Sequence, residues 1–232
     1  SVRKALSGEL VPDAVNVKGG AIDEDIRPSL PLVEKLSQVA TAIAGELPVS
    51  IAIEVKGDIS GHDCSVLATS AIKGALLATG AEDVTYVNAP NIAEERGLTA
   101  TVTTNAESPE FRSMITLHAS FADGKFVDVH GTLMGIRKVE KIIAIDGFDL
   151  DLPPTSHMLF LRYGDRPGIV GIVGNTLGKA NINIAGMQVA RNSEGGEALM
   201  AITVDSSIPN EMVELVKKET GSISVTSVSL LG

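Results

Sequence analysis

The sequence predicts an α+β protein of two domains: an α/β domain with a mostly antiparallel sheet, then a ferredoxin-like domain with the order β-α-β-β-α-β. Three observations support this prediction. The segment 151–156 contains two adjacent prolines and lacks helical periodicity, which is typical of a linker. Before it, apolar residues alternate over several segments between 99 and 145, as they do in strands. After it, strand and helix periodicities follow one another in the order just given.

In the first domain, the apolar spacing sets the order of the elements. Residues 1–17 are expected to be the end of a preceding part of the protein. Helices are predicted at 29–46, where Pro28 and Pro31 lie near the start, and at 62–79. The predicted strands are 49–57, 84–88, 99–105, 113–121, 125–134 and 137–145.

One hairpin of this domain can be predicted to the residue. Side chains that pair across two strands must share a face of the sheet. A two-residue loop would set the apolar Ala119 opposite Asp128, whereas a three-residue loop, 122–124, sets it opposite Val127. The longer loop also places Gly124 at the left-handed position that such loops require. We therefore predict the three-residue form.

The second domain follows the linker and is predicted element by element. Its elements are strand 157–163, helix 167–180, strands 183–191 and 196–205, helix 209–220 and strand 223–231. The segment Asn192-Ser-Glu-Gly-Gly196 fits a hairpin turn. In the last strand, the alternation slips at Thr226-Ser227, which predicts a bulge there.

Composition limits the classes of function. Hydrophobic residues are 44% of the chain and aromatic residues only 3%, so aliphatic side chains must fill the core. The formal net charge of −10 leaves no basic surface for phosphates, which argues against a nucleic-acid partner. The single cysteine, Cys64, excludes an intrachain disulfide and is expected to be a small buried hydrophobe. Because we find neither a membrane-length apolar run nor a secretory signal, we expect a cytoplasmic protein without a membrane partner.

The most informative motif is Tyr163-Gly-Asp-Arg-Pro-Gly168, followed after a glycine-rich segment by Asn181-Ile-Asn-Ile184. Pro167 suits a first helical turn, whose free amides attract a carboxylate. Asp165 can accept hydrogen bonds from an ammonium group, and Asn183 offers both a donor and an acceptor. These groups predict a pocket for a small zwitterion. Since Asn183 lies at the opposite end of the helix, we expect a second subunit or a loop to close the pocket. In the alternative interpretation, Asp165 only caps the helix and Asn183 only fixes a turn.

Glycines recur on one face of the helix after this motif. Gly171, Gly174 and Gly178 each cost about 1 kcal/mol of helix propensity relative to alanine. A close approach to the sheet or to another helix would explain that cost. The Gly-x-Gly-x-x-Gly pattern of nucleotide sites is absent, so nucleotide binding is not predicted here.

Two further groups of side chains are candidate sites. The first group is His118, Asp128 and His130, which could bind a metal ion or simply lie on a solvated face of the sheet. The solvated face is favoured, because the residues lack the close spacing of metal ligands. The second group is Arg137, Lys138 and Lys141, which could bind a phosphate or carboxylate or simply lie in a solvated loop. No Ser-His-Asp set, nucleophile elbow or phosphate-binding loop is found, so no catalytic residue and no metal ligand is assigned.

The motif from Tyr163 to Ile184 resembles an ACT domain, a ferredoxin-like module that senses amino acids. Three other segments resemble the C-terminal half of the long form of the D-3-phosphoglycerate dehydrogenases: Leu10-Val-Pro-Asp-Ala-Val-Asn16, Asn88-Ala-Pro-Asn-Ile-Ala-Glu-Glu-Arg-Gly97 and Gly131-Thr-Leu133. The resemblance covers the whole chain. It implies three parts: the tail of a catalytic part at 1–17, an intervening regulatory domain at 18–151 and an ACT domain at 157–232.

The resemblance implies a function for the second domain. Enzymes of this family oxidise 3-phosphoglycerate with NAD in the first step of L-serine biosynthesis. L-Serine inhibits them by binding ACT domains paired side by side, so a homo-oligomer, a dimer or tetramer, is implied. Tyr163, Asp165 and Asn183 fall where the family contacts L-serine. The family's catalytic residues and NAD-binding glycines would lie before Ser1, so the chain alone should bind no cofactor and have no dehydrogenase activity.

The intervening domain resembles one that binds substrate-like anions. Lys141 falls on a basic position of that site, but the second basic position, expected shortly after Gly147, is not matched by Phe148-Asp-Leu-Asp151. Two alternatives remain for the chain as a whole. One is the regulatory part of an iron–sulfur serine dehydratase, against which the lone Cys64 counts. The other is an ACT domain that only joins subunits and binds no ligand.

Overall fold

The computed structural model describes residues 22–231, which fall into two compact units. The first unit ends at Ile143 and the second begins at Ala144, so the division lies within strand β5 (Val139–Ile145), ahead of the predicted linker at 151–156. The tail expected at 1–17 lies outside the described residues. The predicted α+β fold is confirmed, with two sheets that are mostly antiparallel.

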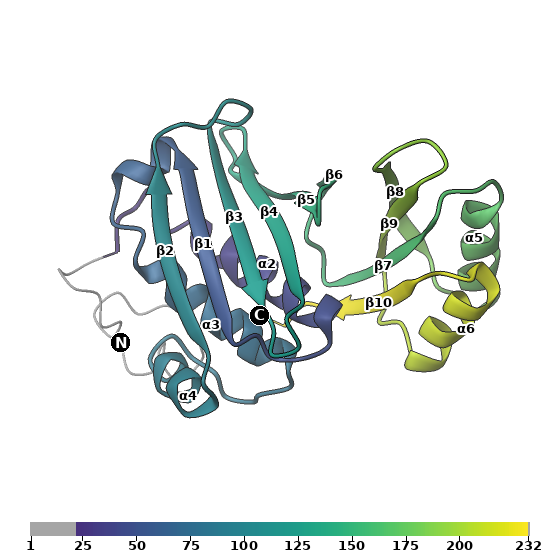
Figure 1. The fold of residues 1–232 in the computed structure, drawn as a ribbon, viewed down its shortest axis with the longest axis horizontal. Helices are drawn as coiled ribbons and strands as arrows, with labels where there is room; N and C mark the ends of the chain where they lie inside the picture. The colour runs from purple at the N-terminus through teal and green to yellow at the C-terminus, as the bar shows by residue number, and fades with distance from the viewer. Residues whose placement is uncertain (1–21, 232) are drawn as a thin grey trace. The chain divides into compact units, whose positions relative to one another are not determined.

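The first unit is a sheet with helices on one face (Figure 1). Its strands lie in the order β2-β1-β3-β4-β5, and β1 is parallel to β2 but antiparallel to β3. The remaining strands are β1 Ser50–Gly57, β2 Thr99–Asn105, β3 Ser113–Ser120 and β4 Phe126–Met134. The helices are α2 Ser29–Ala44, α3 Val66–Ala78 and α4 Ala89–Arg96, with a short 3-10 turn, η1, at Asp58–Gly61.

Helix α2 packs closely on the sheet and on α3, and two glycines permit this. A Cβ atom on Gly131 of β4 would lie 2.8 Å from Cδ1 of Leu36. A Cβ atom on Gly74 of α3 would lie 2.1 Å from the carbonyl oxygen of Glu34. Apolar side chains of β1 and β3, such as Ile53 and Leu117, fill the space beneath α2 and α3 and are almost fully buried. Cys64 is buried as well, as expected.

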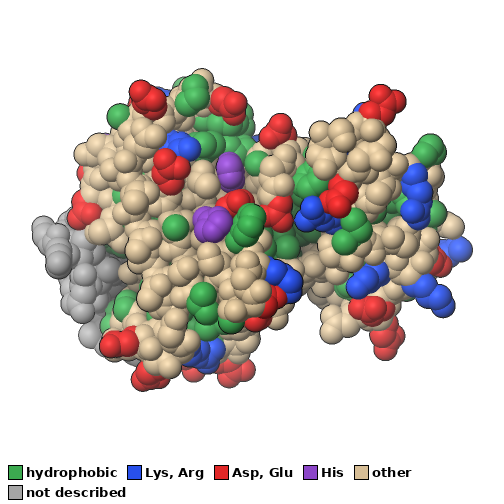
Figure 2. Space-filling view, viewed as in Figure 1, with side chains coloured by type: hydrophobic (Ala, Val, Ile, Leu, Met, Phe, Trp, Pro, Cys, Tyr) green, Lys and Arg blue, Asp and Glu red, His purple; other side chains and the backbone are tan. Residues whose placement is uncertain are grey.

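The predicted hairpin is confirmed in register and in loop length. Ala119 pairs with Val127, and Gly124 has a φ of 83° at the end of the loop. On the opposite face, Nδ1 of His118 lies 2.6 Å from Oδ1 of Asp128. Figure 2 shows histidine side chains at the surface over this sheet. Within the described residues, the side chains close enough to share a metal ion are Asp23, Asp25 and His62. His118, Asp128 and His130 are not in that group.

The strand predicted at 84–88 is wrong. A turn occupies this segment and leads into α4. The side chain of Asn88 accepts a hydrogen bond from the backbone N–H of Thr85 at 2.7 Å and donates one to the carbonyl oxygen of Asp83 at 2.8 Å. A side chain that satisfies local backbone groups in this way favours a turn over a strand.

Tyr86, in the same turn, completes a buried polar network. Nζ of Lys73 lies 2.8 Å from Oε1 of Glu34, and both side chains are about nine-tenths buried. The hydroxyl of Tyr86 donates to Oε2 of Glu34 at 3.1 Å. Burial raises the pKa of Tyr86, so its hydroxyl keeps its proton. A buried charge pair is stable only while each ion keeps its partner.

The second unit has the predicted order of elements. Two helices pack on one face of the sheet β10-β7-β9-β8, which is antiparallel at each pairing (Figure 1). The elements are β7 His157–Gly164, α5 Ile169–Lys179, β8 Ile184–Arg191, β9 Glu197–Val204, α6 Asn210–Thr220 and β10 Ser224–Ser229. The core between helices and sheet is aliphatic apart from Tyr163.

Two details of this unit differ from the predictions. The bulge predicted at Thr226-Ser227 is wrong, because β10 pairs with β7 in an unbroken register, and the irregularity lies instead between Ile184 and Gly186 of β8. An extra strand, β6 (Phe148–Leu152), pairs with β5 and includes the first two residues of the predicted linker, 151–156. It is tied to β8 by the backbone N–H of Asp151, which donates to the side-chain oxygen of Gln188 at 2.8 Å. Within residues 22–231, no helix has the length and apolar character that crossing a bilayer requires.

We predict that Lys73→Met lowers the free energy of unfolding by about 3–5 kcal/mol, because it leaves the Glu34 carboxylate buried without its partner. Denaturant unfolding followed by circular dichroism would measure the loss. Adding Glu34→Leu and Tyr86→Phe to this variant should recover most of it, since apolar side chains can replace a buried ion pair and the hydroxyl that donates to it. The matched control is Lys125→Met, whose exposed pair with Asp123 should matter little. Equal losses in both single variants would contradict the prediction.

Candidate functional site

A pocket of about 310 Å³ lies in the second unit where β7 leads into α5. The segment 163–170 forms one side of it, and Val189 and Arg191 of β8 form the other. Strand pairing brings these segments together. Tyr163 of β7 pairs with Ala198 of β9, and Ala198 pairs with Arg191 of β8, so the three residues form one row across the sheet.

The turn before α5 gives the pocket its helix terminus. Gly168 has a φ of 93°, a left-handed conformation that side-chain-bearing residues rarely adopt, and α5 begins at the next residue. No side chain caps this helix start and its first turn contains no acidic residue. The first amides of a helix have no intrahelical acceptor and carry partial positive charge. The terminus can therefore receive an anionic group.

Asp165 and Arg191 supply the charges of the pocket. Nη1 of Arg191 lies 3.3 Å from Oδ2 of Asp165, and the side chains are 57% and 20% exposed. The backbone N–H of Asp165 donates to the carbonyl oxygen of Gly196 at 2.8 Å, which fixes the loop over the start of β9. Tyr163 is almost fully buried, and burial followed by the charge of Asp165 raises the pKa of its hydroxyl.

Asn183 does not reach this pocket within one chain. Its side chain is exposed and donates to Oδ2 of Asp205 at 2.6 Å. The structure therefore brings together Tyr163 and Asp165 but not Asn183. It adds Arg191, which the sequence reasoning missed. The position of Arg191 beside Tyr163 follows from two strand pairings: the hairpin at 192–196 pairs Arg191 with Ala198, and Ala198 pairs with Tyr163.

Comparison with known proteins decides the family. A family model for the D-3-phosphoglycerate dehydrogenase intervening domain matches residues 25–146, and one for the ACT domain matches residues 157–221. The chain belongs to the D-3-phosphoglycerate dehydrogenase family. It contains the two regulatory domains of that family, the intervening domain and the ACT domain.

The relatives are longer than this chain. The chain is 42% identical over 213 residues to the D-3-phosphoglycerate dehydrogenase of Mycobacterium leprae, and the match covers 91% of this chain and 40% of that protein. It is 33% identical over 232 residues to the enzyme of the same name from Synechocystis sp., covering 99% of this chain and 42% of that protein. The chain thus spans about two fifths of the length of these relatives.

The glycine face of α5 in the ACT domain is open. A Cβ atom on Gly171, Gly174 or Gly178 would meet no atom within 4 Å in the described chain. The close approach expected for these glycines is thus not made within the described chain. Val170 on the same helix is 49% exposed, and Val189 on the edge strand β8 is 42% exposed. Helix α5 and the edge strand together present a surface of small and apolar residues.

Of the three cations Arg137, Lys138 and Lys141, only Lys138 lines the pocket of the intervening domain. Lys138 lies in the turn after β4 and lines a pocket of that domain, with its Nζ 3.9 Å from Oδ1 of Asp25. Arg137 and Lys141 do not line it, and Lys141 is half-buried on β5. The position after Gly147 is the buried Phe148. An anion site centred on Lys141 stays a prediction.

We predict that Gly174→Ala raises the free energy of unfolding by about 0.5–1 kcal/mol, because alanine is the better helix former and its methyl group meets open space here. Thermal and denaturant unfolding at low protein concentration would measure it. Gly74→Ala, also within a helix, should instead be strongly destabilising because its methyl group meets the backbone of Glu34. A destabilised Gly174→Ala variant would show that another surface already covers this face.

Proposed function

We propose that the chain is the regulatory part of an NAD-dependent D-3-phosphoglycerate dehydrogenase, and that its ACT domain binds L-serine for feedback inhibition. The observation that carries the proposal is the pairing of Asp165 and Arg191 beside the uncapped start of α5. A carboxylate, a guanidinium and free amides lie around one small pocket. This is the set of groups that a free amino acid can satisfy at both of its charged ends.

The two ends of the ligand have distinct partners. The ammonium group binds Asp165, and the carboxylate binds the amides at the start of α5 and the guanidinium of Arg191. Since the ion pair in the free protein is a single, half-exposed contact at 3.3 Å, separating it costs little. A bound amino acid offers each charged group a new partner, so neither is left without one.

Selection of L-serine requires a second copy of the chain. The side chain of Asn183 is exposed and lies outside the pocket of its own chain. In a side-by-side pair of ACT domains, Asn183 of the partner subunit reads the serine hydroxyl at the rim of the pocket. The open glycine face of α5, with Val170, and the edge strand β8 form the surface that pairs. The glycines then serve close packing between copies, in dimers and tetramers.

Inhibition acts on a catalytic part outside this chain, which oxidises 3-phosphoglycerate with NAD in the cytoplasm. Serine has to bind two global states with different affinity, and such coupling is typically about 1–3 kcal/mol. We propose that serine stiffens the segment 151–156. The first residue of that segment is already tied to Gln188 of the ACT sheet. The relatives are D-3-phosphoglycerate dehydrogenases, which argues against the serine dehydratase alternative.

Calorimetric titration of the chain with L-serine tests the proposal, with D-serine and glycine as controls. We expect saturable binding of L-serine at up to one site per ACT domain. A ligand at 100 times its dissociation constant should add roughly 2.7 kcal/mol to the free energy of unfolding. No heat and no thermal shift would leave the ACT domain as a module that joins subunits without a ligand.

The residue assignment has its own test. Asp165→Asn keeps the shape of the side chain but removes the charge that holds the ammonium group. We expect L-serine binding to weaken by about tenfold to a hundredfold, the cost of losing a charged hydrogen bond. Glu214→Gln on the exposed face of α6 is the matched control and should bind as the parent chain does. Unchanged affinity in Asp165→Asn would refute the role given to Asp165.

A further inference from the structure

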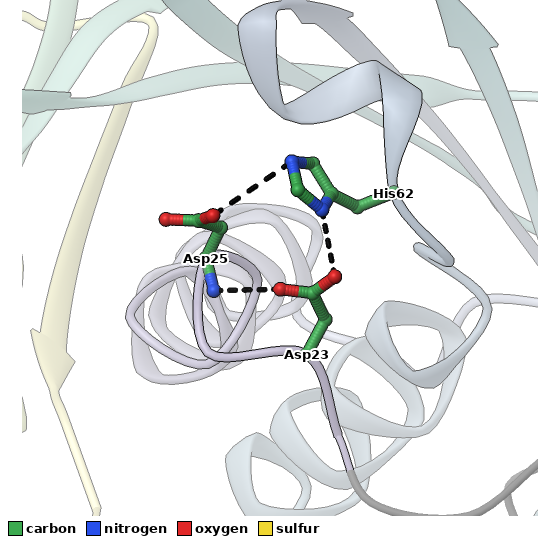
Figure 3. Close-up of side chains that lie close together, drawn as sticks. All are labelled: Asp23, Asp25 and His62. Carbon is green, nitrogen blue, oxygen red and sulfur yellow. Dashed lines mark hydrogen bonds and ion pairs between the residues drawn. The ribbon is translucent and has the colours of Figure 1, made fainter.

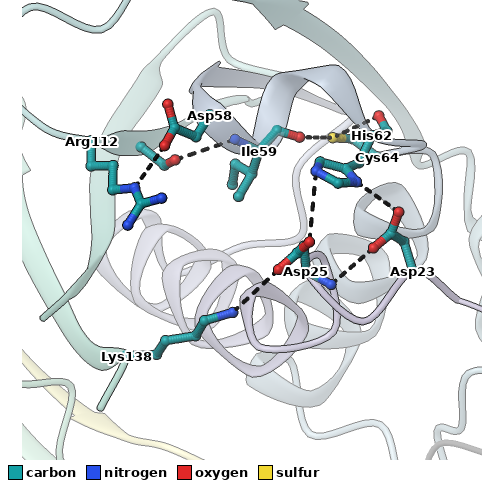
Figure 4. A network of polar contacts seen from close by, with 9 residues as sticks. Asp23, Asp25, Asp58, Ile59, His62, Cys64, Arg112 and Lys138 are labelled. Carbon is teal, nitrogen blue, oxygen red and sulfur yellow. Dashed lines mark hydrogen bonds and ion pairs between the residues drawn. The ribbon is translucent and has the colours of Figure 1, made fainter. Parts of the chain in front are cut away.

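The intervening domain has a pocket of its own, of about 330 Å³. It lies between the first residues of α2, the η1 turn after β1, the start of β3 and the turn after β4 (Figure 4). A volume of this size is in the range of pockets that enclose small metabolites. All of its lining residues belong to the first unit, so it is separate from the ACT pocket.

The inner wall of the pocket contains a polar group that lacks a partner. Ser29, the first residue of α2, is fully buried, and its Oγ makes no hydrogen bond in the described structure. Leaving a buried hydroxyl unsatisfied costs about 1–3 kcal/mol. The pocket is the space that this hydroxyl lines, together with the apolar side chains of Leu32 and Ile115. A ligand that enters can give Ser29 the hydrogen bond that it lacks.

The rim of the pocket carries charges of both signs. Nε of Arg112 lies 2.6 Å from Oδ2 of Asp58. Asp25 lies between Lys138 and His62 without a close contact to either, since Nζ of Lys138 and Nε2 of His62 are each 3.9 Å from its oxygens (Figure 4). At 3.9 Å these pairs are too long for hydrogen bonds. Asp25 and Lys138 can therefore each take a ligand group without losing a short contact between them.

Asp23 holds His62 in place at this rim. Its carboxylate accepts a hydrogen bond from the backbone N–H of Asp25 at 2.9 Å and lies 2.7 Å from Nδ1 of His62 (Figure 3). These two hydrogen bonds, the backbone one first, lower the pKa of Asp23, so the carboxylate stays ionised. Because a carboxylate only accepts, Nδ1 carries the proton of that bond, and Nε2 is turned toward Asp25.

The start of α2 offers the pocket no free amide, because the N–H groups of Ser29 and Leu30 donate to the carbonyl oxygens of Ile26 and Arg27 at 2.8 and 3.3 Å. Charged side chains therefore have to select the ligand. The fixed charges of the lining balance, because Arg112 and Lys138 face Asp25 and Asp58. A dianion alone would be repelled by the two carboxylates, Asp25 and Asp58. A cation alone would be repelled by Arg112 and Lys138. A molecule with both charges meets a partner for each.

We propose that this pocket of the intervening domain binds a small α-amino acid as a second effector. The carboxylate of the ligand binds Lys138 and Arg112 near the start of α2, and its ammonium group binds Asp25. Ser29 hydrogen-bonds the part of the ligand that lies deepest, and Leu32 and Ile115 contact its side chain. The proposal does not depend on serine binding by the ACT domain.

The test uses the Asp165→Asn variant, whose ACT pocket is expected to bind serine more weakly, and nuclear magnetic resonance of its backbone amides. The probes are glycine, L-alanine, L-serine, L-threonine and L-valine. Inorganic phosphate and Mn²⁺, which each carry charge of one sign, are the comparisons. We expect at least one amino acid to shift the amides of Ile59 and Ser113 saturably. The proposal is overturned if no amino acid does so, or if phosphate or Mn²⁺ binds there and the amino acids do not.

A pair of matched variants tests the role of Ser29. Ser29→Ala and Thr41→Val each remove a buried hydroxyl without a partner from α2, but only Ser29 lines the pocket. Both should fold and be at least as stable as the parent chain, because an unsatisfied polar group is removed. We expect Ser29→Ala to weaken amino-acid binding about tenfold or more and Thr41→Val to leave it unchanged. Equal affinities in the two variants would overturn the assignment.

Discussion

The ACT pocket depends on one row of paired backbone residues. Tyr163, Ala198 and Arg191 lie side by side across three strands, and this pairing alone brings the end of β8 beside the start of α5. A shift of β8 by one residue would turn Arg191 to the other face of the sheet and leave Asp165 without its ion pair. The turn before β9 sets that register, since the backbone N–H of Asn192 donates to the carbonyl oxygen of Glu197, and the bulge between Ile184 and Gly186 lies at the other end of β8. Sheet geometry thus determines the charge pattern of the pocket.

Much of the fold could be predicted because alternation and helical spacing are strong where one face is buried. The hairpin loop at 122–124 followed from the rule that apolar residues share a face. The errors arose where side chains satisfy the backbone locally or where polar residues alternate. Asn88 makes a turn of a segment with strand-like residues. In β6, aspartates alternate with buried Phe148 and Leu150. The two prolines that follow predicted a linker beginning at Asp151, so the strand was missed.

The functional residues were harder to predict because they require contacts that local patterns do not encode. Asp165 could be proposed from its place before a helix. Arg191 is distant in sequence, and only the register of two strand pairs shows that it is close. Ser29 has no signal at all in the sequence, because a serine at a helix start is normally a cap. Here its hydroxyl caps nothing and lines a pocket.

Both pockets contain a cation and a carboxylate held in a long contact, 3.3 Å between Arg191 and Asp165 and 3.9 Å between Lys138 and Asp25. In each pocket, a zwitterion meets both signs of charge without leaving an ion alone. Each ligand stabilises the unit that binds it. In the second unit, β5 leads into β6 through Asp146 and Gly147, both with positive φ. Two hydrogen bonds between Asp151 and Gln188 tie β6 to β8, so a ligand-induced change in β8 would act on β6 as well.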